Sequence, residues 1–453
     1  MKSTITLKSF ILFSLVLSRL ISFIAFPNAS IFPDSSTYLS EKFMDFGLVS
    51  FSGNSVRSWP TPLFYSIFPS SSLAVLAVMV ISLFSWYFLI NTILEKIHDS
   101  KKKSFFAFGS TILSCSPFVI QWENSILAPA LLTINLLLLL ALSIKSLSEN
   151  VGSRIYYLGI LLSALFLIQK SSNILIAVTF AGIFLYRAFK KLTTQRKIII
   201  SLFTTTIFVY SGAVGINVDK HWKPISYSNQ SLLWQLGGQS PAATKLVDYL
   251  KTNSNAPKCF WDDAPFQDIN SGIVNIIDNC PGSINYINNN YSKDIRNFLL
   301  TNPIAAIKLV SIGFGATFTS SASNYGSAVG IFPDFTNSIF FGGVEPENYF
   351  TGSDSQVGAF NLLNSGKPIW IHAPGFLVIF APMLLLIGYR RRIQIPQEMR
   401  FLPLIQLGLL LELALTYIAI PTEWARLGSH YFIASLFVGL TMIFSIQSRK
   451  FTQ

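Results

Sequence analysis

Acidic and basic side chains of this 453-residue chain occur together in a few short polar segments between long apolar runs. Lys and Arg side chains bind anionic groups, Arg with two parallel hydrogen bonds and Lys as a point charge. Their position beside carboxylates at one boundary of the molecule favours a site for an anionic substrate. The residues concerned are Asp34, Tyr38, Arg57, Glu123, Lys170, Glu423, Arg426 and His430.

Five of these residues also have a simpler structural interpretation. Asp34 precedes a short segment with apolar residues on one face, so it could cap the N-terminus of an amphipathic helix. Glu423 and Arg426 are three positions apart and could form a local ion pair. Lys170 and Arg57 could extend to lipid head groups. Only the group as a whole favours a binding site.

The apolar runs between these segments predict an all-α integral membrane protein. Hydrophobic residues make up 51% of the chain and charged residues only 12%, against roughly 25% charged residues in soluble domains. A spanning helix needs about 20 mostly apolar residues. About ten such helices are expected, at residues 7–26, 71–95, 105–121, 126–144, 155–170, 172–189, 198–217, 368–389, 401–420 and 430–447.

The basic residues outside the apolar runs predict the orientation of these helices. Cytoplasmic connections carry an excess of Lys and Arg. With ten helices all basic clusters fall on one side, namely Lys2 with Lys8, 101–103, 187–197, 390–400 and 449–450. Both termini are therefore expected in the cytoplasm of a multi-pass protein of the plasma or inner membrane. The same placement of the net charge of +12 argues against nucleic acid as a partner.

The opposite, extracytoplasmic side receives two long connections, at 27–70 and 218–367. The first contains the expected amphipathic helix. The second is too long to be structureless, so we expect a small mixed subdomain there. The chain thus divides into an N-terminal transmembrane module of seven helices (1–217), this subdomain (218–367) and a C-terminal module of three helices (368–453).

Three further features leave alternatives open. The apolar run 303–319 predicts a helix that is interfacial, re-entrant or spanning. Arg19 and Glu412 lie inside expected spans, where each needs a partner. They pair with one another, or Arg19 contacts a lipid phosphate while Glu412 makes a helix-packing hydrogen bond. Cys259 and Cys280 form a disulfide in the outer loop or remain two thiols.

The outer segments resemble the GT-C superfamily of polytopic glycosyltransferases, which take sugars from polyprenyl-phosphate donors. The resemblance rests on four short motifs: Asp34 with Tyr38, the stretch Arg57 to Pro62, the turn Leu167 to Asn173, and Glu423-Trp424-Ala425-Arg426. Many relatives carry an acidic pair in the first outer loop, whereas Ser35 follows Asp34 here. A divalent metal is therefore an open possibility as a cofactor.

The resemblance implies a mechanism and its participants. Asp34 would be the general base for an acceptor hydroxyl of a glycan, lipid or protein. Lys170 and Arg426, with Arg57 next, would stabilise the polyprenyl phosphate that leaves. Membrane lipids would surround the site on its extracytoplasmic face. The remaining substrate-binding candidates are Tyr38, Glu123, Glu423 and His430.

Three other functions are weighed against sugar transfer. Transporters and lipid-linked glycan flippases place polar residues near the bilayer midplane. Here these residues concentrate outside, which favours the transferase. A polysaccharide polymerase is chemically close to it, and a non-catalytic scaffold is the fourth interpretation. The four histidines, His98, His221, His372 and His430, are too scattered to indicate a metal site.

Overall fold

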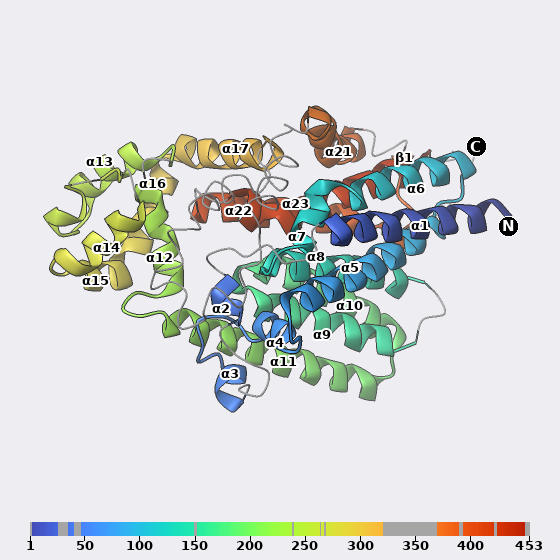
Figure 1. Cartoon of the computed structure of the whole chain (residues 1–453), viewed down its shortest axis with the longest axis horizontal. Helices are drawn as coiled ribbons and strands as arrows, with labels where there is room; N and C mark the ends of the chain where they lie inside the picture. Colours follow the sequence, from blue (N-terminus) through green and yellow to red (C-terminus); the bar gives the residue numbers. More distant parts are fainter. Residues whose placement is uncertain are drawn as a thin grey trace.

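The computed structural model describes residues 2–25, 35–39, 47–148, 152–237, 240–262, 264–266, 269–319, 369–388, 393–420 and 424–448. Helices dominate this part of the chain, whose only strands are the antiparallel pair β1 (Ile393–Gln394) and β2 (Gln447–Ser448). The expected all-α class is confirmed. A bundle of long helices is joined at one end to a cluster of short ones (Figure 1).

Seven of the described helices are long and apolar enough to cross a membrane, or eight if one bent pair counts as a span. They indicate a multi-pass membrane protein. These seven are α1 (Lys2–Ala25), α5 (Ser71–Leu94), α8 (Ala128–Ser146), α10 (Ile174–Lys191), α11 (Thr194–His221), α22 (Leu402–Ala419) and α23 (Trp424–Ser445). The shorter apolar helix α9 (Arg154–Gln169) and the apolar stretch Leu377–Gly388 of α21 (Ile369–Gly388) accompany them.

The segment 105–121 is not the single helix that we expected. Helix α6 (Ser100–Ser114) ends before Ser116, whose backbone is extended, and Pro117 opens the short helix α7 (Pro117–Glu123). A proline disfavours the helical conformation of the residue before it, so the chain breaks at this point. As a result Glu123, at the end of α7, is buried inside the bundle.

Helix α8 forms the centre of the bundle. It is apolar on all sides, and 89% of its most apolar stretch is buried, against 17% for α1 and for α11. A helix that is hydrophobic all round belongs in a core. Helices α5, α9 and α23 pack directly against α8. The exposed apolar side chains of α1 and α11 then form part of the surface that would face lipid.

The basic segments lie together at one end of the bundle. Lys8 of α1 pairs with Glu95 after α5 at 3.3 Å, and Lys102 donates to the carbonyl of Ile446 at 2.6 Å. Arg187 of α10 donates to the carbonyl of Leu147, after α8, at 2.8 Å. The start of α1, α6 and β1 are seen at this end in Figure 1. This arrangement agrees with basic clusters that share one side of a membrane.

Short helices between residues 222 and 301 form a separate unit at the other end of the molecule (Figure 1). Its core includes Leu233, Leu246, Phe260 and Tyr291. The expectation of a mixed subdomain is wrong for its described residues, which are helical apart from one isolated bridge. The helices are α12 (Tyr227–Leu233), α13 (Ala243–Asn253), α14 (Ile269–Asn279), α15 (Ser283–Tyr286) and α16 (Ser292–Thr301).

A disulfide joins Cys259 to Cys280 in this unit, with Cα atoms 5.6 Å apart, so the bridged alternative holds. Replacing both cysteines by serine is expected to lower the free energy of unfolding of the unit by about 3 kcal/mol, because the bridge closes a loop of the unfolded chain. Thermal unfolding of the purified protein measures this. Cys115→Ser is the control, and equal unfolding midpoints for the control and the double variant would contradict the prediction.

Helix α17 (Pro303–Thr319) follows α16 across a bend of 96° and packs along α22 and α23. Gly313 permits this approach, since a Cβ there would lie 2.4 Å from Cγ of Tyr417. Ile304 and Ile307 on the outward side are exposed. The residues that would distinguish an interfacial, a re-entrant and a spanning segment follow residue 319 and lie outside the described part.

Candidate functional site

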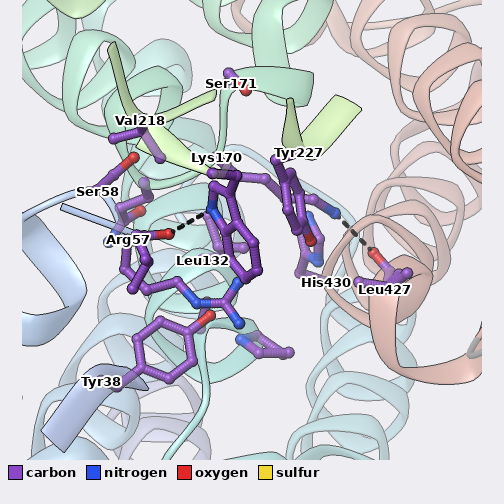
Figure 2. A pocket seen from close by; sticks show the side chains of 15 residues that line it. Tyr38, Arg57, Ser58, Leu132, Lys170, Ser171, Val218, Tyr227, Leu427 and His430 are labelled. Carbon is purple, nitrogen blue, oxygen red and sulfur yellow. Dashed lines mark hydrogen bonds between the residues drawn. The ribbon is translucent and has the colours of Figure 1, made fainter. Parts of the chain in front are cut away.

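A cavity of about 100 Å³ lies where the bundle meets the short helices (Figure 2). Its walls come from α2 (Ser35–Leu39), residues 56–58, and the ends of α8, α9, α11 and α23 that face the short helices. Four of the predicted site residues line it together: Tyr38, Arg57, Lys170 and His430. Segments up to about 390 positions apart in the sequence therefore converge on one pocket.

Arg57 is held between two aromatic rings. Its guanidinium carbon lies 5.0 Å from the ring centre of Tyr38 and 5.7 Å from that of Trp222, and its Nε donates to Thr37 at 2.8 Å. Trp222 in turn donates from its indole nitrogen to the carbonyl of Val56 at 3.0 Å. The charge of Arg57 is thus fixed at the pocket wall, as a planar cation that can bind an anion with two hydrogen bonds.

Lys170 occupies another wall of the same pocket. Its ammonium donates to the carbonyl of Leu427 at 3.4 Å and lies 5.9 Å from the ring centre of Tyr431. Lys170 directly precedes the turn formed by the 3₁₀ segment Ser171–Asn173. Tyr431 donates a short hydrogen bond to the side-chain oxygen of Asn173, whose amide donates to the carbonyl of Phe166 at 2.9 Å. Helix α23 therefore fixes the turn.

Glu412 holds the same turn from α22. Its carboxylate accepts a hydrogen bond from the amide of Leu175, in the first turn of α10, at 2.7 Å, and the residue is 2% exposed. The first amides of a helix have no intrahelical partner. A carboxylate there accepts a hydrogen bond from one of them and is attracted by the positive end of the helix dipole. The alternative in which Glu412 pairs with Arg19 is wrong. Glu412 instead anchors the start of α10, which follows the segment that bears Lys170.

Replacing Glu412 by alanine is expected to lower the free energy of unfolding by about 1–3 kcal/mol, because an amide in the first turn of α10 loses its acceptor. The turn with Lys170 should then become mobile, and binding at the pocket should weaken. Glu412→Gln keeps an oxygen acceptor, so its free energy of unfolding should lie between those of the alanine variant and the native protein. Thermal unfolding in detergent measures the effect. An alanine variant as stable as the native protein would contradict the anchoring role.

His430 is a buried polar residue with unused hydrogen-bonding groups. It is 1% exposed, and neither ring nitrogen has a hydrogen-bond partner among the described residues. Its ring lies against Tyr431, with centres 4.0 Å apart, and it lines the pocket beside Lys170 (Figure 2). Buried polar groups are nearly always paired, so such a side chain at a pocket wall is suited to a ligand or an ordered water.

Glu123 lies apart from the pocket. Its two oxygens accept hydrogen bonds from Arg19 at 2.7 and 3.1 Å and from Ser82 at 2.5 Å. Both members of the ion pair are buried, with Arg19 4% and Glu123 2% exposed. Removing one member of such a pair leaves an uncompensated charge, so the two hold α1, α5 and α7 together. Arg19 thus has a protein partner in place of the proposed lipid phosphate.

The turn after Glu123 positions the helix that follows Asp34. Ser35 is fully buried and donates to the carbonyl of Ile126 at 2.8 Å. The Tyr65 hydroxyl donates to the carbonyls of Ser125 and Leu127, at 3.3 and 2.9 Å. Burial raises the pKa of Tyr65 well above its usual value, which keeps it a donor. Helix α2, and with it Tyr38, is therefore anchored to the bundle.

Three predicted site residues cannot be placed in the pocket. Asp34 and Glu423 lie outside the described residues, and Arg426 belongs to α23 with its side chain outside them. Ser35 directly follows Asp34, and Leu427 directly follows Arg426. Leu427 lines the pocket, so the backbone next to Arg426 is part of its wall, whereas from α2 it is Tyr38 that lines the pocket.

Two aromatic pocket residues were missed from the sequence, Trp222 and Tyr227. Both follow the seventh apolar run, and aromatic residues concentrate at membrane boundaries, which was the available signal. No group of three or more His, Cys, Asp or Glu side chains suited to a metal occurs among the described residues. The part of the pocket that is described thus offers two cations, aromatic rings and a histidine to a ligand.

Comparison with known proteins provides no further guide. No family model, no curated protein and no solved structure matches this chain.

Proposed function

We propose that this chain is a membrane glycosyltransferase of the GT-C type, which transfers a sugar from a polyprenyl-phosphate donor to an acceptor hydroxyl. The observation that carries the proposal is the meeting of Arg57 and Lys170 in one pocket at the end of an apolar bundle. Two fixed cations suit a phosphate group, and the surrounding apolar helix surfaces suit the lipid tail of the same donor.

In the proposed reaction, the acceptor oxygen attacks the anomeric carbon of the donor sugar and gives its proton to the Asp34 carboxylate. A new carbon–oxygen bond forms as the bond from that carbon to the phosphate oxygen breaks. The electron pair stays on the polyprenyl phosphate, whose added charge Arg57 and Lys170 stabilise, joined by Arg426. His430 would donate a hydrogen bond to the phosphate or the sugar.

The pocket position favours a transferase over a flippase. Transporters bind their cargo near the bilayer midplane, often on broken helices, whereas this pocket lies at one end of the bundle. The proposal includes about ten membrane helices, with both termini cytoplasmic and the pocket on the extracytoplasmic face. The disulfide of the helical unit supports this orientation, because disulfides persist in oxidising compartments.

A labelling experiment tests the orientation. In a Cys115→Ser background, a cysteine at the exposed position Lys251 should react in intact cells with a reagent that does not cross membranes. A cysteine at the exposed position Lys101 should react only after permeabilisation. The reverse pattern would overturn the orientation and the proposed face of the active site.

The transfer itself is tested with purified protein in liposomes that contain synthetic polyprenyl-phosphate sugars and a mixture of glycan acceptors. Chromatography of the lipids should show release of free polyprenyl phosphate in amounts equal to the sugar transferred. The release should depend on acceptor. Intact donor that moves between leaflets without release of polyprenyl phosphate would support a flippase and contradict the proposal.

A further inference from the structure

The pocket carries an aromatic pair, Trp222 and Tyr227, of which only Trp222 contacts the proposed phosphate-binding Arg57. The rings of Trp222 and Tyr227 have centres 5.1 Å apart and planes inclined by 43°. Both residues line the pocket, as Figure 2 shows for Tyr227. The side chain of Tyr227 is 37% exposed. Large aromatic side chains that remain partly open beside a cavity offer an apolar face to a ligand.

The two rings are held in place by the backbone around them. Asp219, near the end of α11, accepts hydrogen bonds from the amide of Ser228 at 2.7 Å and from its hydroxyl at 3.1 Å. This contact fixes the start of α12, with Tyr227, beside the end of α11, with Trp222. Trp222 is also tied to the carbonyl of Val56. The pair is thus preorganised, which reduces the entropy that a ligand must remove on binding.

We propose, on the basis of the proposed function, that Trp222 and Tyr227 form the subsite for the sugar ring of the donor. A sugar ring has an apolar C–H face and a polar rim of hydroxyls, and the C–H face packs on the electron-rich face of an aromatic ring. In a polyprenyl-phosphate sugar, a single oxygen separates the ring from phosphorus. The group that contacts the sugar must therefore adjoin the group that binds the phosphate.

The position of Arg57 meets this requirement. Its guanidinium lies 5.7 Å from the ring centre of Trp222, on the pocket wall next to the aromatic pair. A phosphate held by Arg57 and Lys170 would place the attached sugar against Trp222 and Tyr227. Polar side chains of the same pocket, including Gln169 and Ser58, are available for its hydroxyls.

Tyr227 is the residue to test, because Trp222 also supports Arg57 and its replacement would disturb phosphate binding. The probes are farnesyl phosphate and its mannosyl, glucosyl and arabinosyl esters, titrated into the purified protein in detergent. For the ester that the native protein binds best, Tyr227→Ala should weaken affinity roughly fivefold to tenfold and leave affinity for farnesyl phosphate unchanged. Tyr227→Phe should bind the ester nearly as tightly as the native protein, and Lys170→Met should weaken the binding of both probes.

The outcomes separate the two proposals. If Tyr227→Ala weakens both probes equally, the ring contacts the lipid or the phosphate and the sugar subsite is wrong. If it weakens neither, the subsite is also wrong although the phosphate site stands. If the native protein binds none of the probes, the proposed function fails. Unfolding midpoints of the variants confirm that each one is folded.

Discussion

Replacing Asp34 by asparagine is expected to lower the rate of sugar transfer by about 10²- to 10⁴-fold, which is the usual contribution of a general base. Asparagine has nearly the same shape as aspartate but cannot take the proton of the acceptor hydroxyl. The measurement is the initial rate of polyprenyl phosphate release in liposomes, at equal amounts of inserted protein.

The same substitution separates the catalytic role of Asp34 from a structural one. Asn and Asp are equally good N-cap residues, so Asp34→Asn preserves the capping ability of this position. If Asp34 only caps this helix, the variant should be as active as the native protein. Asp34→Ala is the matched comparison, since it removes both the base and the cap. Normal transfer by the asparagine variant would remove Asp34 from the mechanism.

Replacing Lys170 by methionine is expected to lower kcat/KM for the donor by about 10²- to 10³-fold, the range seen when one group that stabilises developing charge is lost. Methionine keeps much of the apolar stem and removes the ammonium that faces the pocket. Lys170→Arg should retain part of the activity, because it keeps the charge although its planar fork has a different geometry. Steady-state kinetics with varied donor concentration measures the change.

Lys308→Met is the control for this substitution. Lys308 is an exposed cation on α17 and does not line the pocket, so its loss removes a positive charge from the same protein without touching the site. Its kinetics should match those of the native protein. If Lys170→Met behaves in the same way, Lys170 serves only to contact lipid head groups or the carbonyl of Leu427, and the phosphate-binding role is refuted.

The apolar runs predicted much of the architecture because burial in hydrocarbon or in a helix core has a simple local signature. A helix in the structure overlaps each predicted span, although within the described ranges seven of these helices are long and apolar enough for a crossing. The break at Pro117 could also have been recognised, since proline acts locally. The helical character of the outer unit was missed because its short helices are polar, and their stability comes from a shared core.

Part of the site could be predicted because several of its residues lie next to apolar runs that are easy to recognise. Arg57, Lys170 and His430 each lie at the boundary of an apolar run, so topology alone brought them to one end of the bundle. Glu123 lies at the same boundary but faces Arg19 inside the bundle, and Glu412 faces α10. The partner of a buried charge depends on how helices rotate against one another. A single sequence carries little information about that rotation.

The central claim is that this chain moves a sugar from a lipid phosphate to an acceptor, with Asp34 as the base. Mass spectrometry of surface glycans and lipid-linked sugars tests it most directly, in a deletion strain complemented with the native protein or with Asp34→Asn. We predict that the native protein restores one sugar on the surface glycan, and that the variant lacks this sugar and accumulates its lipid-linked donor. A complete glycan that collects on the cytoplasmic side in the variant strain would contradict the claim and identify a flippase instead.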